Sequence, residues 1–260
     1  MDNIEHTAYL LDKKGCFSRP DEQIEAFIDA APRQRRIEQT LLPNSLIQAF
    51  SETLCVDIRS LSIEESSQGL FPWELACCWT DRRGNASIRL RPKSKRSSYL
   101  SRDTVLVHEC IHAIRARLDS SIFEEFCAYD LSSELAPLSA WRRFLGPLFS
   151  SAKEACLFLL LLWTTLFTPL FFDSWYPWLL LLLPITHLSA LFIRLYSRWN
   201  VWNKAKKALA SYCTKASALL VRMSDEEIRW LSSLDPSEIH TAIEQQSSST
   251  WRWVIFKKFT

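Results

Sequence analysis

The sequence has almost no net charge and no pair of cysteines at CxxC spacing. Its 31 basic and 29 acidic residues leave a formal charge of +2, so no strong field favours nucleic acid as a partner. The 8 cysteines are dispersed, several of them within apolar runs, where a thiol acts as a small hydrophobic group. The opening stretch MDNIEHTAYLLDKKG has early acids and no continuous apolar region, which argues against a signal peptide. We therefore expect reduced thiols on the cytosolic side of a membrane.

What is present is a folded chain whose composition changes sharply along its length. With 48% hydrophobic and 23% charged residues, the 260 residues can form one domain of ordinary size and a smaller part. Residues 1–150 are expected to form an α+β domain in the cytosol. Residues 151–196 are expected to form a transmembrane helical hairpin, and residues 197–260 a cytosolic helical tail.

The first of these regions alternates between helix and strand patterns. The spacing of apolar residues predicts helices beginning at Pro20 and over 44–53. An alternating run predicts a strand over 55–61, and two strands around a polar turn predict a β-hairpin over 73–91. A helix then begins near Ser101, with Ser or Asp as its cap.

Two leucine-rich runs, 156–172 and 177–193, contain no charged residue. Each is near the lower length limit for a bilayer span, and the turn between them holds Trp175 and Tyr176, residue types typical of membrane interfaces. The alternative is a pair of buried core helices, but neither run has a polar face. The runs therefore predict a transmembrane hairpin, with the lipid bilayer as a partner.

Basic residues flank this hairpin on both outer sides, whereas its turn contains only Asp173. Because cytosolic flanks carry the excess of Lys and Arg, both chain termini and the N-terminal domain are expected in the cytosol. The basic residues after the second run can also bind anionic lipid head groups. The flanking residues are Arg142, Arg143, Lys153, Arg194, Arg198, Lys204, Lys206 and Lys207.

The tail after the hairpin has helical patterns with clear start signals. A helix is expected over 199–221, and Ser224 with Glu227 forms a capping box ahead of the next one. Another short helix is expected from Asp235. The Ser-rich stretch 247–250 predicts a flexible link to an aromatic, basic terminus, which docks on the membrane surface or on the N-terminal domain.

The motif with the most specific chemistry is His-Glu-Cys-Ile-His, which begins at His108. His108 and His112 are four residues apart on a predicted helix, so both imidazoles project from one face. Neutral imidazole at this spacing is a common ligand of Zn²⁺. Glu109 would lie beside the ion, where it can take a proton from the attacking water. The alternative is two partly buried helix histidines without a metal.

A catalytic zinc needs a third protein ligand. The metzincin extension would place Gly at position 115 and His at position 118, but Arg115 and Leu118 occupy them, which excludes that class. The chain continues instead through a turn into a second helix that carries the adjacent acids Glu124 and Glu125.

The stretch Glu125-Phe-Cys-Ala128-Tyr129 resembles the helix that supplies a Glu ligand in gluzincin metallopeptidases, after their His-Glu-x-x-His helix. The resemblance covers about residues 50–135 and implies a compact gluzincin-like domain. It implies Glu125 as the third ligand, with Glu124 as the second choice. If Glu124 is not the ligand, we expect it to be a solvated helix residue. Tyr129 stands where membrane-bound members often have Asp, and it is either a stabiliser of the oxyanion or a packing residue.

In such enzymes an upstream β-hairpin supplies an edge strand that pairs with an extended peptide substrate. The predicted hairpin over 73–91 is placed to do this, with Trp73 or Trp79 near the cleft. The alternative for any one of these residues is an ordinary sheet position.

Several other residues near the motif have two interpretations. Arg115 and Arg117 would orient a substrate carboxylate or, more simply, be solvated on the outer face of the helix. Cys110 and Cys127 are expected to pack the helix interface rather than bind metal. His187 lies within the second apolar run, where we expect it to form a hydrogen bond across the hairpin.

The first hypothesis for function is a membrane-anchored zinc metallopeptidase that hydrolyses peptide or protein substrates in the cytosol. The second is a catalytically inactive, zinc-containing membrane adaptor that binds peptides or partner proteins. A third and weaker one is a zinc hydrolase of small molecules on the same scaffold.

Overall fold

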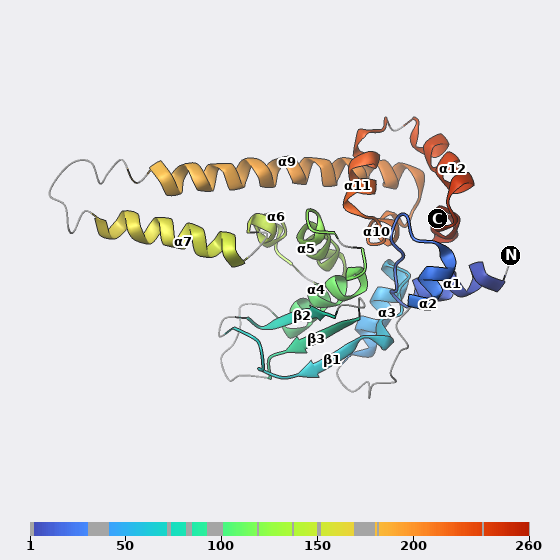
Figure 1. The fold of residues 1–260 in the computed structure, drawn as a ribbon, viewed down its shortest axis with the longest axis horizontal. Coiled ribbons are helices and arrows are strands. Elements are labelled where there is room, and N and C mark those ends of the chain that lie inside the picture. Colours follow the sequence, from blue (N-terminus) through green and yellow to red (C-terminus); the bar gives the residue numbers. More distant parts are fainter. Residues whose placement is uncertain are drawn as a thin grey trace.

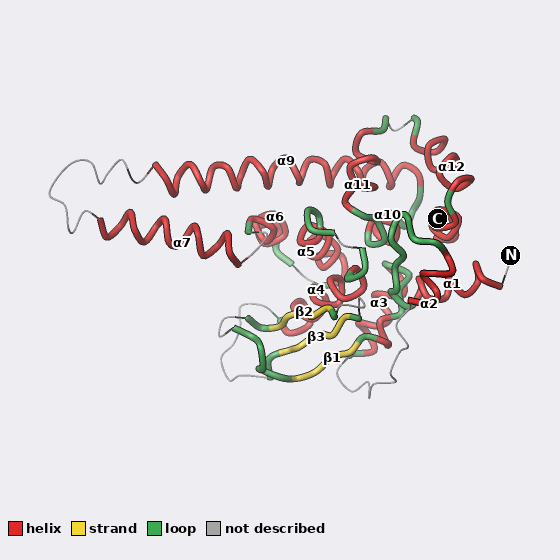
Figure 2. The backbone as a smooth tube through the Cα atoms, in the orientation of Figure 1, coloured by secondary structure: helices red, strands yellow, loops and turns green. Residues whose placement is uncertain are grey.

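A small three-stranded sheet lies beside a group of helices, and two helices project to one side of them (Figure 1). The computed structural model describes residues 3–30, 42–71, 74–81, 85–92, 101–118, 120–136, 138–149, 152–168, 180, 182–235 and 237–259. The α+β class is confirmed, and helix predominates strongly over strand (Figure 2).

The elements follow one another in this order: α1 (Asn3–Lys13), α2 (Ile24–Ala30), α3 (Asn44–Thr53), η1 (Ile58–Ser60), β1 (Ser62–Glu65), β2 (Ala76–Thr80), β3 (Ala86–Leu90), α4 (Arg102–Arg115), α5 (Glu124–Leu135), α6 (Ala140–Leu145), η2 (Gly146–Leu148), α7 (Ala152–Phe167), α9 (Leu182–Tyr212), α10 (Ala216–Leu220), α11 (Asp225–Ser233), α12 (Ile239–Ser249), α13 (Trp251–Phe256) and η4 (Lys257–Phe259).

The predicted β-hairpin is present as β2 and β3, which pair antiparallel with Cys78 opposite Ile88. β1 pairs parallel with the other side of β3, giving the order β1-β3-β2. Among the described residues, β2 is therefore an edge strand. Trp73 lies outside the described residues.

The expected strand over 55–61 is wrong, because the chain turns there before it becomes extended. Cys55 has a positive φ of 55°, and the Asp57 side chain accepts the backbone N–H of Arg59 to cap η1. These two local features break the extended run, so the strand begins only at Ser62.

The helix expected from Ser101 is α4, and the Ser101 side chain accepts the backbone N–H of Thr104 as its N-cap. One side of α4 packs against β2 and β3, and another packs against α5. This arrangement holds the two helices that carry the predicted ligands side by side over the sheet.

The C-terminal tail packs into the same buried core as the N-terminal region, a core that continues from Ala8 to Phe259. The capping box of Ser224 and Glu227 is present at the start of α11. The helix expected over 199–221 is divided, since α9 ends at Tyr212 and α10 follows.

The flexible link expected over 247–250 is wrong: α12 continues to Ser249, and α13 begins two residues later. The aromatic terminus docks on the body of the protein, where Trp253 and Phe256 are buried. Burial of such large apolar side chains stabilises the docked position of the C-terminal end.

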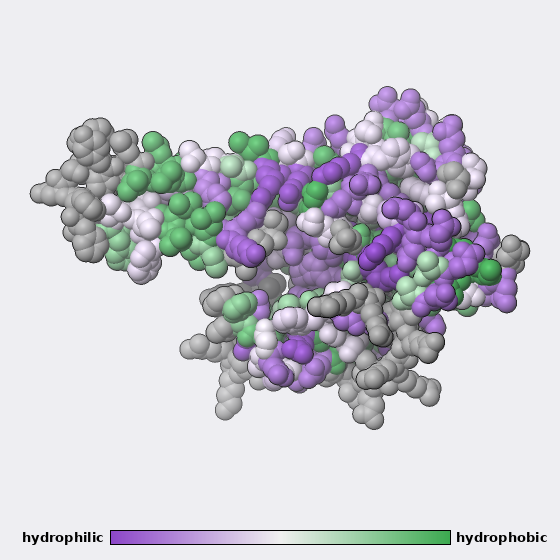
Figure 3. All heavy atoms as spheres, viewed as in Figure 1, coloured by the Kyte–Doolittle hydropathy of each residue, from purple (hydrophilic) through white to green (hydrophobic). Residues whose placement is uncertain are grey.

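The two projecting helices form an arm, defined here as α7 and the part of α9 over 182–193. Arg194 at its base forms an ion pair with Glu154 of α7, with 2.5 Å between Nη1 and Oε1. Apolar side chains cover the arm and give it the greenest surface in the view of Figure 3. The exposed ones are Leu157, Leu159, Leu160, Trp163, Leu166, Phe167, Leu182, Leu183, Ile185, Phe192 and Ile193.

Within the described residues, no single helix combines the length and hydropathy of a membrane span. One pair of helical segments does so together, Ala140–Leu148 with Lys153–Phe167, and these are bent by 85°. The expected turn over 173–176, with Trp175 and Tyr176, lies outside the described residues.

Beyond the arm, α9 continues into the body and is tied to α5. Asp130 of α5 is fully buried and accepts hydrogen bonds from Trp202 Nε1, at 3.0 Å, and Lys206 Nζ, at 2.7 Å. The Arg143 guanidinium also pairs with Asp130, at 2.5 Å. One buried carboxylate thus joins α5 to the long helix of the arm.

Candidate metal centre

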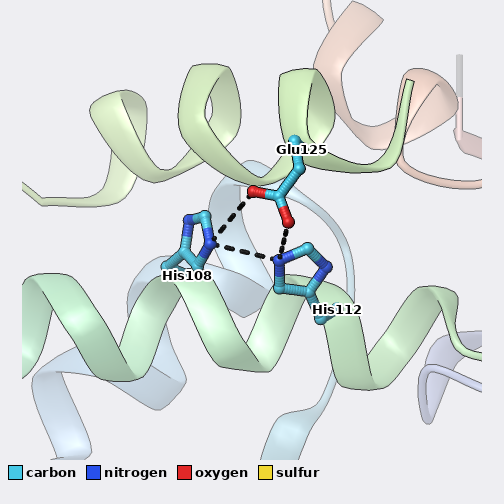
Figure 4. Close-up of side chains that lie close together, drawn as sticks. All are labelled: His108, His112 and Glu125. Carbon is cyan, nitrogen blue, oxygen red and sulfur yellow. Dashed lines mark hydrogen bonds and ion pairs between the residues drawn. The ribbon is translucent and has the colours of Figure 1, made fainter. Parts of the chain in front are cut away.

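His108, His112 and Glu125 converge between α4 and α5 (Figure 4). The Nε2 atoms of the two histidines are 3.1 Å apart. The Glu125 carboxylate spans both, with Oε2 3.6 Å from His108 Nε2 and Oε1 3.5 Å from His112 Nε2. These three side chains can hold a metal ion, since one ligand atom from each lies within 4.8 Å of the others.

The imidazoles reach this position because His108 and His112 are one turn apart on α4. Glu125 lies in the first turn of α5, so its carboxylate crosses directly to them. The ligand set predicted from the sequence is therefore the set that the structure brings together.

The two histidines differ in their protonation. Burial, and next the charge on His112, lower the pKa of His108 to about 3. Burial opposes the charge on His112 as well, but the hydrogen bond to Glu124 and the charge of Glu125 raise its pKa to about 9. A metal ion entering between them would replace the proton on His112.

Glu109 follows His108 and is bonded to β2 through the backbone of Cys78. Burial raises its pKa to about 7, although a backbone hydrogen bond from Cys78 acts in the opposite direction. A carboxylate with this pKa can both accept and return a proton near neutral pH.

These side chains line one open cleft of about 490 Å³. The β2 edge strand forms one wall through Ala76, Cys77, Cys78 and Thr80, and the ends of α4 and α5 form the other. The remaining lining residues are Glu74, His108, Glu109, His112, Arg115, Ala116, Ser120, Glu124 and Glu125.

Glu124 is not the solvated residue that the sequence suggested. Its Oε1 lies 3.0 Å from His112 Nδ1, and its Oε2 accepts a hydrogen bond from Arg115 Nε at 2.8 Å. A carboxylate on the second ring nitrogen fixes the tautomer and orientation of a metal-binding histidine. Glu124 thus holds the imidazole of His112, whereas its neighbour Glu125 faces the Nε2 atoms of both histidines.

Arg115 and Arg117 are buried, and their expected solvation on an outer helix face is wrong. Arg115 Nη1 donates to backbone carbonyls of the tail, and Arg117 Nη2 donates to Glu22 at 2.7 Å. Their partners lie about a hundred residues away in either direction, so helical spacing alone could not reveal them.

Tyr129 packs against the site from the side. Its ring centroid is 4.5 Å from that of His108, and the ring also lies close against Gly146. Tyr129 is not among the described residues that line the cleft. Its position favours the packing interpretation over the oxyanion role.

The remaining candidates take structural positions. Cys110 and Cys127 are fully buried in the core. Trp79 is exposed on β2, beneath the Arg89 guanidinium, and is not among the described residues lining the cleft. The His187 ring stacks on Phe158 of α7, and its Nε2 has no hydrogen-bond partner in the described parts of the chain, contrary to expectation.

No protein-family model, no curated protein and no solved structure matches the chain.

Proposed function

We propose that this protein is a zinc-dependent peptidase anchored to a membrane by its arm. The observation that carries the proposal is the meeting of His108, His112 and Glu125 in a cleft that also contains the half-buried Glu109. Two imidazoles, one carboxylate and an adjacent general base are the groups that a hydrolytic zinc site requires.

The spacing of the three ligands supports zinc. Ligand atoms about 2.1 Å from a tetrahedral ion lie about 3.4 Å from one another. The two histidine Nε2 atoms are 3.1 Å apart, and each lies 3.5 or 3.6 Å from a different oxygen of the Glu125 carboxylate. His108, His112 and Glu125 would hold the ion, and the open cleft leaves room for water and substrate at a fourth position.

Bound zinc would supply Lewis acidity toward the scissile carbonyl and the attacking water. Glu109 would accept the proton of that water on its carboxylate and then return it to the amide nitrogen that leaves. Burial favours this exchange, because it brings the pKa of Glu109 to about 7. Glu124 would keep His112 in its orientation throughout.

The wall formed by β2 supports peptide as the substrate. An extended peptide can add to the free edge of a sheet through main-chain hydrogen bonds. The β2 residues that line the cleft include Cys78, the residue whose backbone bonds Glu109. A peptide paired with this edge would therefore pass beside the general base.

The arm supports a bilayer anchor, since its exposed apolar side chains would otherwise face water. The basic residues at its base would then lie on the cytosolic side, with the catalytic body. This topology keeps the cleft outside the lipid.

The test is a Glu109→Gln variant of the full chain in detergent or vesicles. We expect it to retain about one zinc per chain by elemental analysis, but to cleave a peptide library about 10²–10⁴-fold more slowly than the wild type. A wild-type chain that holds zinc and cleaves no peptide would favour the adaptor alternative. A chain that takes up no zinc would exclude both.

A further inference from the structure

We propose that the segment 216–233, formed by α10 and α11, is an integral part of the metal centre. Arg115 and Asp225 are its positioning residues. They hold Glu124 and the start of α5, and through these His112 and Glu125, in the arrangement that binds metal. The inference rests on the proposed zinc site. It adds that zinc binding requires a segment about a hundred residues away in the sequence.

The first link runs from the metal ligand to the tail through Arg115. Its Nε donates to Glu124, which contacts His112 Nδ1. Its Nη1 lies 3.3, 2.9 and 3.1 Å from the carbonyl oxygens of Leu220, Val221 and Met223. The Arg115 side chain is fully buried, so these carbonyls take the place of water around one end of the cation.

The second link runs from the tail to the start of α5. The Asp225 carboxylate accepts backbone N–H groups from Ser121, Ile122 and Phe123, at 3.0, 2.7 and 3.1 Å. It also accepts the hydroxyl of Ser120. These four donors come from the turn that leads directly into Glu124 and Glu125. Phe123, the N-cap residue of α5, makes no side-chain cap, and Asp225 accepts its backbone N–H from another helix.

Both links act on the neighbouring acids Glu124 and Glu125. Arg115 fixes the position of the carboxylate that orients His112, and Asp225 fixes the backbone from which Glu125 projects. If the tail moved away, Arg115 would lose three backbone carbonyl acceptors, and the turn before α5 would lose the four hydrogen bonds that it donates to Asp225. Metal binding and docking of the tail must therefore stabilise each other, by the reciprocity of linked equilibria.

The experiment measures zinc dissociation constants of the full chain by competition with a chromophoric chelator. The variants are Arg115→Lys, which keeps the charge but not the fork of donors, and Asp225→Asn. The matched control is Arg117→Lys, because Arg117 is also buried just beyond the end of α4 but pairs with Glu22. We expect about 10-fold weaker zinc binding in both variants, the scale seen for supporting partners of metal ligands. The control should bind zinc like the wild type.

Hydrogen exchange of the wild-type chain provides a second measurement that needs no variant to fold. Addition of zinc should slow exchange at the amides of Ser121, Ile122 and Phe123 and over 220–225, but not in α12. A Co²⁺-substituted Arg115→Lys protein should show altered ligand-field bands, which a loss of global stability alone would not produce.

The outcomes separate this inference from the function on which it rests. A wild-type chain that binds no zinc would overturn the proposed function and the inference with it. A wild-type chain that binds zinc, with both variants matching the control and no protection of 220–225, would overturn only the inference.

Discussion

At the scale of single residues, two neighbouring acids on α5 perform different tasks. Glu125 points to the Nε2 atoms of both histidines, whereas Glu124 reaches Nδ1 of His112 and the Arg115 guanidinium. Adjacent residues on a helix project about 100° apart, which is why one carboxylate enters the site and the other passes beside it.

We expect Glu125→Gln and Glu124→Gln to weaken zinc binding to different extents. Glu124→Gln removes the charge that orients His112 and should raise the zinc dissociation constant about 10-fold. Glu125→Gln removes a ligand and should raise it further. Titration of both variants with zinc and a competing chelator measures the difference; a larger effect at Glu124 would reverse the assignment of ligand and support.

The sequence was sufficient to predict which three side chains come together, but not the residues that hold them in place. His108 and His112 share one helix, and Glu125 follows within a short turn, so local spacing brings all three together. Arg115 instead depends on carbonyls of residues 220–223, and its burial results from long-range packing. The prediction that Arg115 is solvated was wrong because the residues that cover its side chain lie in another part of the chain.

At the scale of elements, Gly146 at the junction of α6 and η2 sets the distance to α5. A Cβ atom at this position would overlap the Tyr129 ring, which also contacts His108. The absence of a side chain is therefore what allows the ring to lie between the two elements.

We expect Gly146→Ala to destabilise the protein by about 1–3 kcal/mol, because the added methyl group forces the ring to move. In a Tyr129→Ala background the same substitution should be neutral or slightly stabilising, as Gly-to-Ala changes usually are in helical backbone. Urea unfolding of the four proteins in this double-mutant cycle gives the coupling energy. Additive effects would show that the contact is not the cause.

The junction of α11 with α5 should make stability depend on pH. Burial alone would raise the pKa of Asp225, but hydrogen bonds from Ser120 and three backbone N–H groups hold it below its ordinary value of 3.8. A carboxyl group whose pKa is lower in the folded than in the unfolded state stabilises the fold at pH values above its unfolded pKa. This contribution disappears as the pH falls through the folded pKa.

Asp225→Asn should therefore lower the free energy of unfolding by about 2 kcal/mol at pH 7, the scale of hydrogen bonds to a charged group. The difference in unfolding free energy between wild type and variant should stay constant from pH 7 to pH 5 and become smaller below about pH 4. Denaturant unfolding across this range measures it. A gap that widened in acid would contradict the assignment.

Sequence patterns predicted most elements, since α3, α4, the β2–β3 hairpin and the capping box of α11 all depend on local signals. The errors fall where a local pattern was ambiguous. The alternating run 55–61 predicts a strand, but the positive φ of Cys55 and the cap formed by Asp57 make the chain turn there. The serines over 247–250 read as a linker, yet the buried terminus beyond them holds them in a helix.

At the scale of the whole molecule, the arm is the part most unlike the rest of the surface. We expect the full chain to remain with phospholipid vesicles after an alkaline carbonate wash. Replacing Leu159 and Leu160 with Asp should release it, because a charge in the centre of a span costs about 2.5–3.5 kcal/mol.

The control for this release places the same charges on the body. Ile4 and Leu10 of α1 are also exposed, at 45% and 44%, compared with 60% and 59% for Leu159 and Leu160. Replacing Ile4 and Leu10 with Asp should leave the chain on the vesicles. Equal release by both pairs would mean that the arm has no special affinity for lipid.

The continuity of α9 fixes the distance between the base of the arm and α5. From Arg194 at the base of the arm to Trp202, where Asp130 joins α5, the unbroken helix rises about 12 Å at 1.5 Å per residue. With the arm in a bilayer, the ligand-bearing helix would be held at this fixed height. A substrate tethered to the same membrane would need about four extended residues to cover that distance. Chain length beyond the lipid, as well as side-chain identity, would then decide which peptides reach the cleft.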